Sequence, residues 1–112
     1  MSNMTENKPN TGGDNPAPAI DKLIHEPARF NIMAHLYVVE SADFLFLMRQ
    51  TGLTKGNLSS HMSKLEGASY IDVIKEFKGK RPHTMLRLTG KGRTAFKNYR
   101  QQMLGMLGSI SG

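Results

Sequence analysis

The 112-residue sequence contains no cysteine, which excludes disulfide bonds, thiolate metal sites and a cysteine nucleophile. It also lacks tryptophan, and no early apolar run is long enough for a signal peptide or a membrane span. We therefore expect a cytoplasmic protein without a membrane partner. Hydrophobic residues make up 38% of the chain, which suffices for one small core. These totals predict a single small domain.

Acidic residues are missing from the last third of the chain. Every Asp and Glu lies before Phe77, although the formal net charge of the whole chain is +6. The basic residues that follow are Lys78, Lys80, Arg81, Arg87, Lys91, Arg93, Lys97 and Arg100. Positive charge concentrated in one region can form a field, and such a field favours a polyanionic partner.

None of the motifs that carry catalysis or cofactor binding is complete. The segment 90–95, GKGRTA, matches the glycine pattern of a dinucleotide site, but that site needs a later acidic residue and none follows Glu76. A P-loop is absent, and no serine has a local His and acidic arrangement. The histidines are not spaced as metal ligands: His25, His35, His61 and His83. We predict no enzyme, no cofactor and no metal.

The first half of the chain has helical periodicity. Residues 1–18 are polar and rich in Asn, Gly and Pro, which predicts a disordered N-terminal arm. A first helix is expected to begin at Pro27, with a buried stripe of Phe30, Met33, Leu36 and Tyr37. Ser41 is the expected cap of a second helix, which ends at Gly52. Its expected core residues are Phe44, Leu45, Leu47 and Met48.

A third helix is predicted over residues 54–66, with Thr54 as its cap and a buried face of Leu58, Met62 and Leu65. Only Gly52 and Leu53 separate it from the second helix. Two short helices joined by so tight a turn cross steeply, as in a helix-turn-helix.

The opposite face of this third helix carries small polar groups and almost no acid. Gly56, Asn57, Ser60, Ser63 and Lys64 lie there, with Ser59 and His61 on the flanks. Serine, glycine and asparagine weaken a helix, but they allow close approach to a DNA groove and can hydrogen-bond bases or phosphates. A face that is merely exposed to solvent is the alternative.

After Gly67 the period changes from about 3.6 to 2, which predicts a β-hairpin over YIDVIKEF and TMLRL with a basic loop at 78–83. This loop could lie along a phosphate backbone or in a minor groove. Lysines that only protect the hairpin from edge pairing are the alternative. Thr89 is the expected cap of a last helix, which runs from about Lys91 towards Leu107 and ends in a glycine-broken tail.

Three segments resemble winged helix-turn-helix transcriptional regulators of the MarR and ArsR kind: EPARFNIMAHL (26–36), LTKGNLSSHMSKLEGASYI (53–71) and LRLTGKGRTAF (86–96). The resemblance covers about residues 20–103. It implies a mainly α fold with a small β-hairpin (α+β): a winged helix DNA-binding domain at 19–103 with a three-helix core, a wing and a C-terminal helix. Two positions depart from the usual pattern, Ser69 where a glycine is common and Gly90 where an acidic or helix-favouring residue is usual.

The resemblance also implies a function, sequence-specific binding of double-stranded DNA by a homodimeric transcriptional regulator, sometimes under control of a small-molecule effector. Asn57, Ser60, His61 and Lys64 would face the major groove. Thr54, Lys55 and Ser59 would lie near the helix start, where phosphates are closer. Lys78, Lys80 and Arg81 would form the wing. The alternative is a winged helix module that binds an acidic protein partner.

A dimer surface is predicted on the last helix. Apolar residues recur there at spacings of 3 and 4, typical of a seam between two helices. The dimerisation candidates are Phe96, Tyr99, Met103, Met106, Leu107 and Ile110, so that residues 104–112 would contribute to the dimer. Packing of Phe96 and Tyr99 within their own domain is the alternative for those two. A pocket between the first and last helices could hold an effector, whose identity the sequence does not give.

Overall fold

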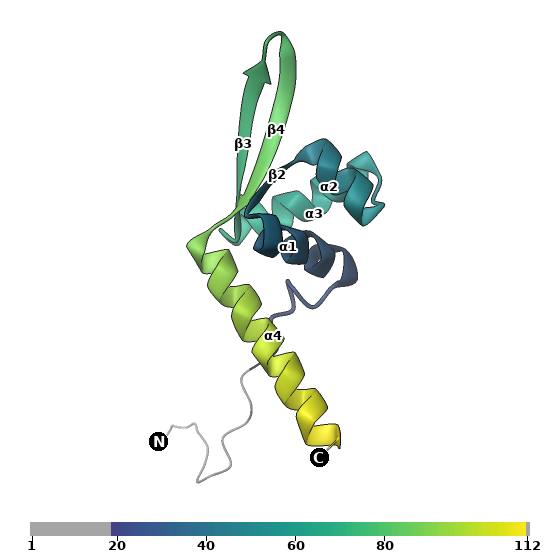
Figure 1. Ribbon diagram of the computed structural model, residues 1–112, viewed down its shortest axis with the longest axis vertical. Coiled ribbons are helices and arrows are strands. Elements are labelled where there is room, and N and C mark those ends of the chain that lie inside the picture. Colours follow the sequence, from purple (N-terminus) through teal and green to yellow (C-terminus); the bar gives the residue numbers. More distant parts are fainter. Residues whose placement is uncertain (1–18, 112) are drawn as a thin grey trace, which may run out of the picture.

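Four helices and a small antiparallel sheet make up residues 19–111, which the computed structural model describes; the arm predicted for residues 1–18 lies outside them. In chain order the elements are α1 (Pro27–Val39), β2 (Ser41–Asp43), α2 (Phe44–Thr51), α3 (Lys55–Gly67), β3 (Ile71–Lys78), β4 (Arg81–Leu88) and α4 (Gly90–Ser111). The predicted α+β winged helix class is confirmed, with a three-helix core beside a long hairpin and an extended last helix (Figure 1).

Helix α1 begins as the sequence predicts. The Glu26 carboxylate accepts a hydrogen bond from the Arg29 N–H at 2.8 Å, and Pro27 occupies the first turn, where an N–H is not needed. Ile32, Met33 and Leu36 are fully buried. Phe30 was expected in this stripe, but it is 41% exposed, because its ring lies over α4 at the edge of the core.

The expected start of the second helix was wrong. Ser41–Asp43 form the short strand β2, which pairs antiparallel with β4, Ala42 opposite Leu86. Asp43 caps α2 instead of Ser41, since its carboxylate accepts the Phe46 N–H at 2.6 Å.

The remainder of α2 follows the prediction with one exception. Leu47 is fully buried, whereas Leu45 is 57% exposed and points away from the core. Gly52 ends the helix at φ +73°, in the left-handed region that favours glycine. Thr54 then caps α3 by accepting the Asn57 N–H at 3.2 Å, as predicted.

The sheet has the order β2-β4-β3, and its hairpin is longer than the sequence suggested. The register runs from Ile71 opposite Leu88 to Lys78 opposite Arg81. The expected loop at 78–83 was therefore wrong, because only Gly79 and Lys80 form the turn. Gly79 has φ +64°, as the first position of a type II′ hairpin turn requires.

Helix α4 is anchored beneath the hairpin by Thr89. The Thr89 hydroxyl donates to the Ser69 carbonyl at 2.7 Å and accepts the Gly92 N–H at 2.9 Å, so it caps α4 as predicted. Ser69, which stands where a glycine is common, takes the left-handed φ of +63° itself. The expected glycine-broken tail was wrong, since α4 continues through Gly105 and Gly108 to Ser111.

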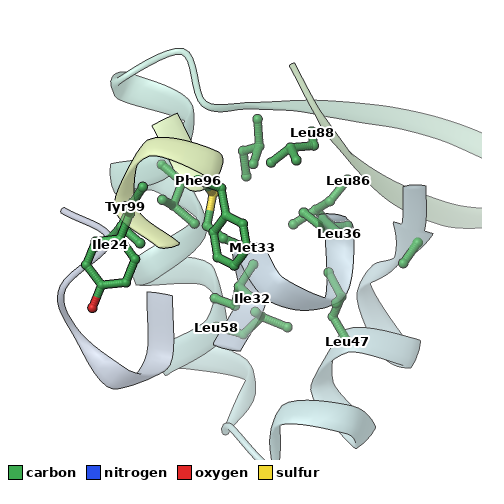
Figure 2. Packing of buried hydrophobic residues seen from close by; sticks show 13 residues of the cluster. Ile24, Ile32, Met33, Leu36, Leu47, Leu58, Leu86, Leu88, Phe96 and Tyr99 are labelled. Atoms are coloured by element: carbon green, nitrogen blue, oxygen red, sulfur yellow. The ribbon is translucent and has the colours of Figure 1, made fainter. Parts of the chain in front are cut away.

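The core lies between the three short helices, the base of the hairpin and the first half of α4, as Figure 2 shows. Its fully buried side chains come from the three short helices, the hairpin and the segment before α1: Ile24, Ile32, Met33, Leu36, Leu47, Leu58, Leu65, Ile71 and Leu86. Phe96 and Tyr99 of α4 close it from one side, and each is 6% exposed. The core therefore holds α3 and the hairpin in a fixed relation to one another.

Candidate DNA interface

Helix α3 presents a polar face because its apolar residues are committed to the core. Leu58 and Leu65 are fully buried, and Met62 is half-buried. The predicted groove residues Asn57, Ser60 and Lys64 are exposed, as are Thr54 and Lys55 at the helix start. Ser59 is half-buried. Gly56 adds no side chain, and a Cβ placed there would meet nothing within 4 Å.

His61 lies at the edge of this face, against α1. Its Nδ1 is 3.1 Å from Arg29 Nη1 and 4.0 Å from Glu26 Oε1. Arg29 is itself fixed, because its Nε donates to the Leu23 carbonyl at 2.6 Å. The Arg29 backbone N–H, and to a lesser extent the nearby His61, hold the pKa of Glu26 below its ordinary value. His61 is thus oriented by α1, a contact that no local sequence signal could reveal.

The wing is the tip of the hairpin. Lys78 and Arg81 stand opposite each other in the last pair of the ladder, and Lys80 lies in the turn. All three are exposed, and among the described residues they form no ion pair. Lys75 of β3 is also exposed and without an ion pair in this part of the chain. It was missed because it lies in the strand and not in the expected loop.

His83 ties the wing to the start of α2. Its Nδ1 is 3.1 Å from Glu76 Oε2, and its Nε2 is 3.6 Å from Asp43 Oδ2. The backbone N–H of Phe46 lowers the pKa of Asp43, and His83 adds to this effect. Asp43 and Glu76, the acidic residues near the wing, therefore both lie against His83.

Several other basic residues of the last third are engaged within the protein. Arg87 pairs with Asp72 at 3.2 Å. The guanidinium of Arg93 lies 4.9 Å from the centre of the Tyr37 ring, and the Lys91 ammonium lies 5.8 Å from that of Tyr70. Of the basic residues after Phe77, those without such contacts among the described residues are Lys78, Lys80 and Arg81 at the wing and Lys97 on α4, so the positive region available to a partner is narrower than the sequence suggests.

A groove of about 450 Å³ lies between the start of α1 and the middle of α4, where the sequence suggested a pocket. It is lined by His25, Glu26, Pro27, Phe30, Tyr99, Arg100, Met103 and Leu104. From Leu104 at the rim of the groove, which is 58% exposed, α4 continues with exposed apolar side chains: Met106 46%, Leu107 61% and Ile110 80% exposed. Phe96 and Tyr99, two of the six dimerisation candidates, pack instead in the domain's own core.

Neither a metal site nor a membrane-spanning helix is found in residues 19–111. No group of three or more His, Asp or Glu side chains there could hold a metal ion. No helix in the same residues is both long and apolar enough to cross a membrane.

A helix-turn-helix followed by a basic two-stranded hairpin defines a winged helix protein. A family model described as a winged helix DNA-binding domain matches residues 28–107, and the chain belongs to this family. The predicted resemblance to winged helix transcriptional regulators is thereby confirmed, and DNA binding and transcription regulation are the functions that this fold carries.

The chain is also similar to individual proteins. An uncharacterised protein of Methanocaldococcus jannaschii is 36% identical over 89 residues, which are 80% of this chain and 97% of that protein. The structure of a transcriptional regulator homologue from Pyrococcus horikoshii OT3 has a TM-score of 0.76 and 26% identity, covering 80% of this chain and 88% of that one. A MarR-family transcriptional regulator from Silicibacter pomeroyi shares the fold, with a TM-score of 0.57, 17% identity, and coverage of 80% and 72%.

Proposed function

We propose that this protein is a homodimeric transcriptional regulator that binds specific double-stranded DNA sequences in the cytoplasm, without enzymatic activity or a cofactor. Helix α3 enters the major groove, and the wing contacts the backbone or the minor groove. The observation that carries the proposal is the combination of a small, polar, exposed α3 face with a wing tip whose cations have no acidic partner among the described residues.

The α3 face suits base reading because of what its side chains can do. Asn57 can pair with an adenine through two hydrogen bonds, and Ser60 can donate or accept at a base edge. Lys64, one turn further along, carries a charge for a guanine or a phosphate. Thr54, Lys55 and Ser59 contact phosphates near the helix start, and His61 reads from the edge where Arg29 holds it.

The wing supplies affinity that does not depend on sequence. Each phosphate neutralised by a lysine or arginine releases counterions, so Lys78, Lys80 and Arg81 should make binding strongly dependent on salt. Their separation from α3 along the hairpin would let both elements contact DNA at once (Figure 1).

A second copy of the chain covers the exposed half of α4. Met103 and Leu104 line the groove, and they continue directly into the apolar run of Met106, Leu107 and Ile110. This continuity favours a second protein surface over a small effector as the occupant, because an effector in the groove would leave the run exposed. A dimer would also present two α3 helices to two half-sites.

Selection of bound sequences from a random duplex library at about physiological salt tests this function, since non-specific binding is weak there. An enriched inverted repeat with half-sites about 10 base pairs apart is expected. Binding without an enriched motif would contradict sequence-specific recognition. No salt-dependent affinity for any duplex would favour the alternative, a module for an acidic protein partner.

A further inference from the structure

Phe77 is a large apolar side chain at the far end of the wing, and it is 71% exposed. It lies one residue before the end of β3, opposite Pro82 of β4. Within the described residues it takes part in no ring contact with another aromatic side chain. The hairpin therefore carries an apolar pair where contact with its own core is impossible.

The alternation of side chains along β3 decides which face of the sheet carries Phe77 and Pro82. Ile71, Val73 and Phe77 lie on one face of β3, and Ile71 is buried in the core. Phe77 consequently lies on the sheet face against which the helices pack, but beyond the point where they end, since the hairpin projects past them (Figure 1). It is placed on the same side of the sheet as α3.

Cations surround the tip of the hairpin that carries the ring. Lys75 shares its face, Lys80 lies in the turn, and Lys78 and Arg81 lie on the other face. Glu76 is the nearest acidic residue along β3, but it belongs to the opposite face and faces His83. An apolar tip bordered by cations complements a stack of bases bordered by phosphates.

We propose that Phe77 is a wedge that the wing inserts between two base pairs from the minor groove, with Pro82 packed behind it. This inference rests on the proposed function, because it requires that the wing bind duplex DNA. Phe and Pro are among the residues that open base steps in this way, and such insertion bends the duplex towards its major groove.

The test uses the full-length protein and duplexes of the selected sequence that carry 2-aminopurine at one step at a time, because its fluorescence rises when stacking is lost. Wild-type protein is expected to raise the fluorescence several-fold at one step in each half-site. F77A should abolish this rise and weaken binding about tenfold, as truncation of a stacking side chain does. F77L, which keeps an apolar wedge, should retain most of both effects.

Two controls make the result specific. V38A removes another exposed apolar side chain, from α1 and far from the wing, and should change neither fluorescence nor affinity. Circular dichroism melting should show that F77A folds as the wild type does, because the ring it removes is mostly exposed.

The possible failures can be told apart. Salt-dependent duplex binding with no change in fluorescence at any step would overturn the wedge and leave the proposed function intact. An equal rise with wild type and F77A would show that another group opens the step. Absence of duplex binding by the wild type would overturn both proposals.

Discussion

The backbone of Gly92 in α4 lies against the carbonyl oxygen of Tyr70, so closely that a Cβ at Gly92 would stand 2.1 Å from that oxygen. This approach, together with the Thr89 hydroxyl, joins the base of the hairpin to the last helix. The second glycine of the segment GKGRTA therefore has a packing role, which accounts for a motif that otherwise resembles a nucleotide site.

Gly92→Ala should lower the free energy of unfolding by about 2 kcal/mol or more, because the new methyl group can only fit if the backbone moves. Urea denaturation measures this. Gly90→Ala is the matched control, since a Cβ there meets nothing within 4 Å, and it should leave stability unchanged or raise it by up to about 1 kcal/mol. Equal effects of the two changes would contradict the assigned contact.

Lys80→Ala combined with Arg81→Ala should weaken binding to all duplex sequences and reduce the slope of log K against log salt by about two, because two phosphate contacts are lost. Fluorescence anisotropy over a range of salt measures this slope. The control is Lys22→Ala with Lys97→Ala, two exposed lysines away from the wing, which should keep the slope. A changed motif with an unchanged slope would assign the wing to base reading instead.

Asn57→Ala should relax the sequence preference at one position of each half-site, at a cost of about 1–3 kcal/mol for the preferred base, because its amide would make paired contacts there. Repeating the selection with the variant measures the preference. The salt slope should not change, since no charge is lost. A uniform loss over all sequences would instead place Asn57 at a phosphate.

Leu107→Glu with Ile110→Glu should convert the proposed dimer into a folded monomer, because two charges would enter its interface in each subunit. Sedimentation velocity measures the mass, and circular dichroism checks the fold. Leu45→Glu, which changes a 57% exposed leucine on α2, is the control and should keep the dimer. A wild-type monomer at every concentration tested would refute the interface.

Tyr70 should ionise at a higher pH than an ordinary tyrosine. Burial, and then its hydrogen bond to the Asp21 carboxylate, raise the pKa of Tyr70 to about 12 from the ordinary 10. Because the folded-state pKa is the higher one, this tyrosine's contribution to stability is complete below pH 10 and is lost as the pH rises towards 12. Stability measured at pH 10 and above should therefore fall more in the wild type than in Tyr70→Phe.

Asp21→Asn provides a second test of the Tyr70 environment. Without the carboxylate, the absorbance of ionised tyrosine near 295 nm should increase at a lower pH, although burial still opposes ionisation. An unchanged absorbance titration in Asp21→Asn would mean that burial alone governs Tyr70.

Local patterns predicted most of the helices correctly, because caps and apolar periodicity are properties of short segments. Thr54, Gly52 and Thr89 each act where the sequence placed them. Strand β2 was missed because it has three residues and exists only through pairing with β4, more than 40 positions away. The predicted loop at 78–83 included Pro82, but this residue lies in β4, which has only one neighbouring strand at that point, where a proline is tolerated.

The sequence also predicted only part of the candidate DNA interface. The polar face of α3 follows from which residues are apolar, so exposure of Asn57, Ser60 and Lys64 could be deduced. Contacts between elements could not be deduced, and these contacts decide which basic side chains remain available to DNA. Arg87, for example, pairs with Asp72 only because the strand register puts the two residues opposite each other. The contact of His61 with Arg29 likewise depends on the packing of α1 against α3.

Helix α4 is one unbroken helix of 22 residues, so at 1.5 Å per residue it is a rod of about 33 Å. Thr89 holds one end at the base of the hairpin, and the other end carries the exposed apolar side chains. A tilt of the helix by about 10° would displace its far end sideways by about 6 Å. In the proposed dimer, the angle at which α4 is held therefore sets the distance between the two wings, and hence the spacing of half-sites that the two subunits can span.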